Sequence, residues 1–194
     1  MMDLLETLIE RKSTPPRLMN ENGGPTPSDI QDILRAAISA PDHGAIRPWR
    51  FVVIEGKNRA ILGQTFADAL KMRDPEASEE AIQKELNRPL RAPTVIAILA
   101  RVVNDRPNVP RIEQIVATAC AAQNMLVAAN AKGFGGILLT GKNAHDPNVR
   151  AFFGLNPDDE LVSFLYLGKP NGEQPSKSRP DPNDFIEEFG TMQI

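Results

Sequence analysis

The stretch Ala40–Phe51 (APDHGAIRPWRF) marks the point where the chain passes from a helix into a strand. Upstream of it, Thr26 is a good helix N-cap, a proline follows at the first helical position, and apolar residues recur at helical spacing over Ile30–Ile38. At its end, the branched and aromatic run Arg50–Glu55 is typical of a strand. The sequence therefore predicts a helix ended by Pro41, a short loop and a strand.

Further elements are expected on both sides of this stretch. Periodicity and turn residues predict helices over 2–12, 58–73, 78–87, 110–132 and 146–153, and strands over 93–103, 133–140 and 161–168. Strands scattered among helices without strict alternation predict an α+β fold, with a small mixed β-sheet surrounded by helices. We expect one domain over residues 1–194, in which the proline-rich residues 170–194 form an extended C-terminal arm.

The long helix that ends near Lys132 carries large and small apolar residues on every side. A helix that is apolar all round has to be buried all round. Two arrangements satisfy this requirement: a central helix wrapped by one chain, or a helix covered by a second subunit. In a chain this small we favour a dimer.

Composition excludes several classes of protein. The net charge of −3 over 194 residues gives no basic excess for nucleic-acid binding. Cys120 is the single cysteine, and His43 and His145 are the two histidines, so neither a disulfide nor a His/Cys metal site is expected. The N-terminus lacks the pattern of a signal peptide, and residues 114–131 are too polar for a membrane span, so a cytoplasmic protein is expected.

Common catalytic motifs are not found. Gly136–Lys142 spells GxxxxGK, but Asn143 follows where a phosphate-binding loop needs Ser or Thr, and the interior reads as a strand. No GxSxG nucleophile motif occurs. The run Gly133–Gly136 follows a helix, so Gly133 is expected to cap that helix, and the glycines could also let a flat ring approach the backbone.

The first helix ends in Arg11, Lys12 and Ser13. Cations at a helix C-terminus interact favourably with its dipole, and the same cluster suits a phosphate. The residues alone leave both interpretations open.

Taken in order, these segments resemble the FMN-dependent nitroreductase family, and most of all its compact bacterial NAD(P)H nitroreductases. The resemblance rests on the Arg-Lys-Ser helix end, on APDH and PW within Ala40–Phe51, on Arg91-Ala92-Pro93 before a strand, and on the runs GFGGI and FLYLG that begin at Gly133 and Phe164. It covers Met2 to about Phe185, and it depends on the order and spacing of the motifs.

The resemblance implies a homodimer with FMN bound at the subunit interface and the C-terminal arm reaching the partner. By this resemblance Arg11, Lys12 and Ser13 hold the phosphate end of FMN, while His43 reaches the flavin from the other subunit. The isoalloxazine ring is expected along Leu138, Leu139 and Thr140. The nicotinamide nucleotide is expected at the end of the long helix, at Ala128, Ala129, Asn130, Ala131, Lys132 and Gly133.

Three positions depart from the family pattern. Lys12 replaces an arginine, Ser39 replaces an arginine, and Arg47 stands where Gln or Asn is usual. A cation at Arg47, near the pyrimidine edge of the flavin, would favour the anionic reduced ring.

The implied activity is reduction of nitroaromatics, quinones or a related small acceptor by NAD(P)H, with hydride transfer through flavin N5 and no catalytic side chain. Two alternatives stay open: a flavin-binding carrier or sensor without significant turnover, and a flavin-dependent dehydrogenase of one metabolite.

Overall fold

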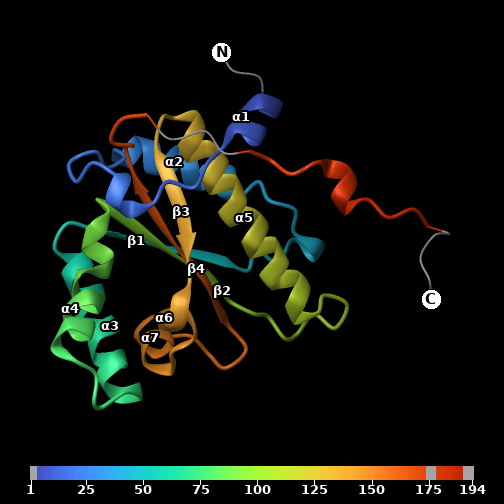
Figure 1. Cartoon of the computed structure of the whole chain (residues 1–194). Coiled ribbons are helices and arrows are strands. Elements are labelled where there is room, and N and C mark those ends of the chain that lie inside the picture. Colours follow the sequence, from blue (N-terminus) through green and yellow to red (C-terminus); the bar gives the residue numbers. More distant parts are fainter. Residues whose placement is uncertain (1–3, 174–177, 190–194) are drawn as a thin grey trace.

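The computed structural model describes residues 4–173 and 178–189 (Figure 1). In chain order its helices and strands are α1 (Leu4–Glu10), α2 (Pro27–Ala37), β1 (Trp49–Glu55), α3 (Asn58–Arg73), α4 (Glu79–Asn87), β2 (Thr94–Ala100), α5 (Arg111–Ala131), β3 (Gly135–Leu139), α6 (Gly141–His145), α7 (Pro147–Phe152) and β4 (Glu160–Gly168). Short 3-10 turns lie at η1 (Pro16–Leu18), η2 (His43–Ala45), η3 (Arg88–Arg91) and η4 (Pro182–Phe185). The predicted α+β class is confirmed.

The four strands form one sheet in the order β1-β2-β4-β3, and every neighbouring pair is antiparallel. The expectation of a mixed sheet is therefore wrong for the described strands. The connections explain why. Two helices, α3 and α4, join β1 to β2, and two more, α6 and α7, join β3 to β4. A pair of helices that turns back on itself returns the chain to the same end of the sheet, where the next strand has to run in the opposite direction.

Helices cover both faces of the sheet, so two apolar cores form. Alternate residues of β2 point to opposite faces: Ile96 and Ile98 pack with α2 and α5, whereas Val95, Ala97 and Leu99 pack with α3 and α7. All seven residues of β2 are buried, as its nearly continuous apolar sequence predicts. In Figure 1, α2 and α5 lie on the side away from α3 and α4.

A bulge interrupts the alternation in β4. Ile98 pairs with Ser163 and Leu99 pairs with Leu161, so Val162 is the extra residue. The bulge leaves the buried hydroxyl of Ser163 without a hydrogen-bond partner.

Local signals in the sequence form the expected caps. Thr26 and Asp29 make a capping box at the start of α2, and Asp146 accepts from the amides of Asn148 and Val149 at the start of α7. Gly133 ends α5 with a φ of +80°. Its amide donates to Asn130 and the Phe134 amide donates to Ala129, both at 2.9 Å, which is a Schellman motif.

The long helix α5 is not buried on all sides within one chain. Ile112 is 62% exposed and Val116 is 52% exposed, on a stripe that faces away from the sheet. The expectation that residues 114–131 are too polar for a membrane span is not supported, because α5 meets the criteria of length and composition for a span; core helices of water-soluble proteins meet the same criteria. Its other face packs against the sheet.

Part of the expected arm is described. Residues 178–189 are exposed throughout and run outward from the body (Figure 1). Residues 174–177 and 190–194 of the arm lie outside the described ranges.

Candidate functional site

The basic end of α1 lies against the start of β3. The Thr14 amide donates to the carbonyl of Gly136 at 3.0 Å, and Ser13 makes a parallel bridge to the same glycine. Gly135 allows this approach, because a Cβ added there would lie 2.5 Å from the Thr14 hydroxyl oxygen. The predicted phosphate residues and the predicted ring strand are thus joined directly.

Arg11 is held in an unusual state. Its Nη1 atom is buried and has no hydrogen-bond partner. Burial, together with the nearby charge of Arg179, lowers the pKa of the Arg11 guanidinium. A buried nitrogen of a cation without an acceptor is costly, and a bound anion would satisfy it.

Arg179 is a residue that the sequence reasoning missed. Its guanidinium donates to the carbonyl of Ile9 at 2.9 and 3.1 Å and also to the carbonyl of Arg11. The C-terminal segment therefore brings a second guanidinium to the end of α1, which carries the partial negative charge of the helix dipole. Nothing in the proline-rich sequence around Arg179 singles it out, because the contact joins residues about 170 positions apart.

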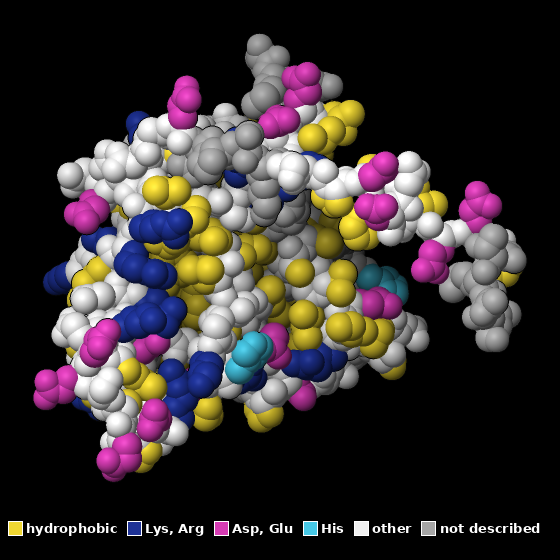
Figure 2. Space-filling view, in the orientation of Figure 1, with side chains coloured by type: hydrophobic (Ala, Val, Ile, Leu, Met, Phe, Trp, Pro, Cys, Tyr) yellow, Lys and Arg dark blue, Asp and Glu magenta, His cyan; other side chains and the backbone are white. Residues whose placement is uncertain are grey.

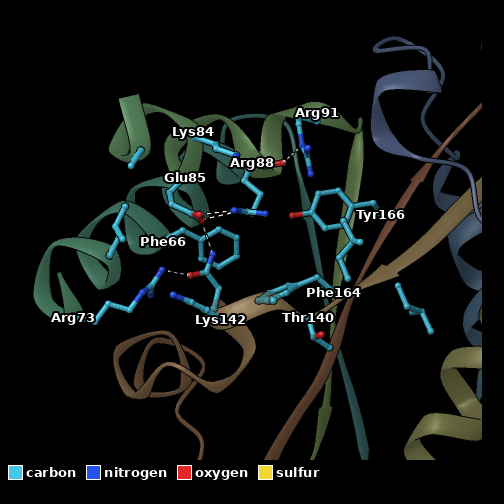
Figure 3. Close-up of a pocket in the computed structure, with 16 residues that line it drawn as sticks. Phe66, Arg73, Lys84, Glu85, Arg88, Arg91, Thr140, Lys142, Phe164 and Tyr166 are labelled. Carbon is cyan, nitrogen blue, oxygen red and sulfur yellow. Dashed lines mark hydrogen bonds and ion pairs between the residues drawn. The ribbon is translucent and has the colours of Figure 1, made fainter. Parts of the chain in front are cut away.

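A cavity of about 670 Å³ lies between the α3–α4 pair and the strands β3 and β4 (Figure 3). Leu138, Leu139 and Thr140 line one side of it, so the three predicted ring residues meet the same hollow. Phe66 and Phe164 line it as well and make an edge-to-face pair with ring centroids 5.2 Å apart. Its volume is in the range typical of small-ligand sites.

The opposite wall of this large cavity is basic, and its role was also missed. Lining cations come from α3, α4, η3 and α6, namely Arg73, Lys84, Arg88, Arg91 and Lys142. The sequence predicted helices over residues 58–73 and 78–87, but no part for them in a site. A usable signal was present: Lys84, Arg88 and Arg91 are spaced i, i+4 and i+7, which places them on one helical face.

Among the described residues, Glu85 is the one carboxylate that lines the large cavity. It accepts from Arg88 Nε at 2.8 Å and from the Asn143 side-chain amide at 2.7 Å. Arg73 in turn donates to the Asn143 oxygen at 3.1 Å. Burial opposes ionisation of Glu85, but these hydrogen bonds and the two guanidiniums keep its pKa below the usual value, so it stays charged.

Tyr166 closes the end of the large cavity near η3. Burial raises the pKa of its hydroxyl to about 12, against the opposing charges of Arg91 and Arg88. The hydroxyl is therefore protonated at neutral pH and can donate a hydrogen bond.

A second cavity, of about 390 Å³, joins the end of α1 to the end of α5. Lys12, Thr14, Asn130 and Gly133 are among the residues that line it. The other predicted nicotinamide positions do not line this cavity; Ala128 is half-buried and Ala131 is exposed. Ala129 is fully buried, and Lys132 is paired with Asp29 and Asp32 of α2 at 3.1 and 2.7 Å.

Gly136 packs against protein atoms. A Cβ added there would lie 2.9 Å from Leu126 and 3.1 Å from Leu167. Together with the contact between Gly135 and Thr14, this shows that the two glycines admit neighbouring side chains of the chain itself. The interpretation that they admit a flat ring has no support at these positions.

His43 and Arg47 lie elsewhere on the chain. The Nδ1 atom of His43 is 2.6 Å from the Glu113 carboxylate, and His43 lines a shallow third cavity of about 250 Å³ beside Ile112 and Val116. Arg47 has a φ of +54°, and its amide donates to Asp42 at 2.6 Å. Neither residue lines the large cavity of its own chain.

Over residues 4–173 and 178–189 there is no group of three or more His, Cys, Asp or Glu side chains placed to hold a metal ion.

This chain is similar to known proteins in both sequence and fold. The sequence model of the protein family described as "Nitroreductase family" matches residues 8–169 of this chain. The chain is 41% identical over 191 residues to the Escherichia coli (strain K12) protein named "Putative NAD(P)H nitroreductase YdjA", covering 97% of this chain and 100% of that protein.

Solved structures show the same fold. A nitroreductase-like family protein from Bacillus cereus superposes with a TM-score of 0.81 at 21% identity, covering 98% of this chain and 97% of the other. A nitroreductase with bound FMN from Bacteroides fragilis NCTC 9343 superposes with a TM-score of 0.66 at 20% identity, covering 100% and 99%.

Proposed function

Because this chain belongs to the nitroreductase family, we propose that it is an FMN-dependent NAD(P)H oxidoreductase that reduces nitroaromatics, quinones or related small acceptors. The observation that carries the proposal is the buried, unpartnered Nη1 of Arg11 at the point where α1 meets β3. When bound, FMN supplies two-electron transfer, so that one NAD(P)H and one proton reduce one quinone to a quinol.

The residues at the end of α1 fit the phosphate of FMN. Arg11 has a free donor, and Arg179 adds a second positive charge that lowers the pKa of Arg11. A phosphate accepts charge-assisted hydrogen bonds from such a pair, and Lys12 and Ser13 stand beside it to add two further donors.

Leu138, Leu139 and Thr140 are proposed to lie along the flavin ring. Each of them lines the large cavity. Leu138 and Leu139 are half-buried residues at the end of β3, whose first two residues are buried. Apolar side chains on a rigid strand hold a flat ring in place and exclude water from one of its faces.

The nicotinamide nucleotide is proposed to use Asn130 and Gly133, the part of the Ala128–Gly133 segment that lines the second cavity with Lys12. Asn130 lies in the last turn of α5, and Gly133 follows in the Schellman turn that ends this helix.

The protein is proposed to act as a homodimer. Exposed apolar side chains gather on α5 at Ile112 and Val116, and on α1 at Leu5, Leu8 and Ile9. A second copy covering the α5 stripe would bury this surface. It would also bring His43, which lies beside the stripe, to the flavin of the other subunit, with Arg47 near the pyrimidine edge.

The absorption spectrum of the purified protein tests the proposed function. We expect bound flavin whose absorbance bleaches without oxygen when NADH or NADPH is added, followed by turnover with menadione or a nitrofuran. Bound flavin that neither donor reduces would refute the oxidoreductase. Reduction of the flavin without turnover of either acceptor would favour the flavin-binding carrier or sensor.

A further inference from the structure

The basic wall of the large cavity contrasts with the rest of the chain. Five cations and one carboxylate line this cavity, whereas the whole chain has a net charge of −3. Figure 2 shows Lys and Arg side chains in a row beside an apolar hollow. Among the cations that line the cavity, Lys84 lies on α4, and Arg88 and Arg91 lie on η3.

The guanidinium of Arg88 is fixed in place. Glu85 binds it through two hydrogen bonds. Asn143 donates to Glu85 from the other side, and Arg73 in turn donates to the Asn143 oxygen. A side chain held in this way loses little conformational entropy when it binds a ligand. Since the Glu85 oxygens are already used by these donors, they offer little competition for a ligand.

Three hydrogen-bond donors meet at one end of the cavity. In Figure 3 the Tyr166 hydroxyl points toward Arg88, and Arg91 approaches from the end of η3. Tyr166 is 1% exposed and lines the cavity. Two guanidiniums are donors only, and a protonated phenol beside them donates as well. Such an end is complementary to an anion with several acceptor atoms.

The floor of the same cavity is apolar, and its two aromatic rings meet edge-to-face with 74° between their planes. Phe66 and Phe164 form it, and Leu138 and Leu139 border it. The cavity therefore combines a surface for an aromatic ring with a cationic end for an acidic substituent.

We propose that Arg88, Arg91 and Tyr166 recognise the carboxylate of an aromatic electron acceptor, so that the enzyme prefers acidic aromatic acceptors to neutral ones. This inference rests on the proposed function and names the substrate class of that site. Arg88, Arg91 and Tyr166 are specificity residues, and Glu85 is a positioning residue that acts through Arg88.

The test compares two acceptors that differ mainly in charge, 4-nitrobenzoate and 4-nitrobenzamide, in the FMN-loaded protein. Reduction of either nitro group to the hydroxylamine takes four electrons from two NAD(P)H, consumes two further protons and releases one water. We expect a higher kcat/KM for the benzoate, and a preference that falls as salt is added.

Three variants probe the cationic end. Arg91→Gln is expected to lower the ratio of kcat/KM for benzoate over benzamide by about tenfold, the scale of a lost hydrogen bond to a charged group. Tyr166→Phe is expected to lower it by about threefold, and Arg91→Lys to retain part of the preference. Arg88→Gln is avoided because it would leave the buried Glu85 carboxylate without its cation. Arg35→Gln is the matched control, because it removes the same charge from an exposed position on α2.

The outcomes separate the two proposals. If NAD(P)H fails to bleach the bound flavin, the proposed function itself falls. If bleaching and turnover are normal but Arg91→Gln changes both acceptors equally, the inference is overturned and the function stands. A shift in flavin reduction potential or FMN affinity in Arg91→Gln, with an unchanged acceptor ratio, would likewise overturn the inference and assign the basic wall to the flavin.

Discussion

At the scale of single residues, Arg11 combines a buried, unpartnered nitrogen with a second guanidinium close by. Both features are unfavourable without an anion and favourable with one. Arg11→Ala is therefore expected to weaken FMN binding by about 1.5–3 kcal/mol, or roughly 10- to 100-fold in Kd. Titration of the apoprotein followed by flavin fluorescence measures this change.

Arg35→Ala is the control for general charge effects on FMN binding, because the Arg35 side chain is exposed and lies on α2. Equal FMN affinity in wild type and Arg11→Ala would remove Arg11 from the phosphate site.

Asp159 is a buried carboxylate whose ionisation should contribute to stability. Burial opposes its charge, but amide hydrogen bonds from Asn156 and Val102 and the ion pair with Arg101 at 2.9 Å lower its pKa. Because the folded pKa lies below the unfolded value of about 3.9, the contribution is fully present above that pH and is lost as the pH falls through the folded pKa.

Asp159→Asn is expected to lower the free energy of unfolding at pH 7 by about 3 kcal/mol, since it leaves Arg101 without its carboxylate. The difference in the free energy of unfolding between this variant and wild type should shrink as the pH falls below about 4. Urea unfolding at several pH values measures both effects. Asp158→Asn, at the exposed neighbour, should change little, and an equal loss in both variants would contradict the argument.

The residue types in the sequence predicted only part of the candidate site. Arg11, Lys12 and Ser13 were noticed because three polar residues cluster at a helix end. Arg179 and Tyr166 gave no such signal, because the first acts through a contact across the chain and the second reads as an ordinary strand residue. Their roles depend on tertiary packing that local sequence patterns do not encode.

At the scale of elements, Gly133 after α5 and Gly135 at the start of β3 give a graded prediction. Gly133→Ala should destabilise by about 1 kcal/mol through backbone strain alone, because φ is +80° and an added Cβ meets nothing within 4 Å. Gly135→Ala should cost more, about 2–3 kcal/mol, because the added Cβ would lie 2.5 Å from the Thr14 hydroxyl oxygen.

Thermal unfolding of the two glycine variants measures the difference in stability. Gly135→Ala should also weaken FMN binding, because it pushes Thr14 and the basic end of α1 away from β3. A larger loss of stability in Gly133→Ala than in Gly135→Ala would contradict this account.

Elements were predicted well where local chemistry determines them. The range 58–73 matches α3, and the N-caps of α2 and α7 form as expected. The direction of the strands was predicted wrongly, because it depends on how α3 and α4 pair in space. The separate helix α6 was missed, since its five residues are too few to show periodicity.

At the scale of the whole molecule, the exposed stripe on α5 leads to a prediction about assembly. Ile112→Glu and Val116→Glu place charges where we propose that a second copy packs. Both should convert the protein to monomers and weaken FMN binding by about tenfold or more, because His43 would no longer reach the other site. Sedimentation velocity and flavin titration measure the two effects.

Ile61→Glu is the matched control for assembly, because Ile61 is an exposed isoleucine on α3, on the opposite side of the sheet. Wild-type protein that sediments as a monomer while it binds FMN tightly would contradict the proposed dimer.

The contact between Thr14 and Gly136 has a consequence for solubility. β3 is the edge strand of the sheet, and such edges can pair with strands of other molecules and start aggregation. By bridging to Gly136, the segment that follows α1 occupies part of this edge in the way that a short extra strand would. The N-terminal segment thus shields the sheet from intermolecular pairing at the same place where it presents its cations.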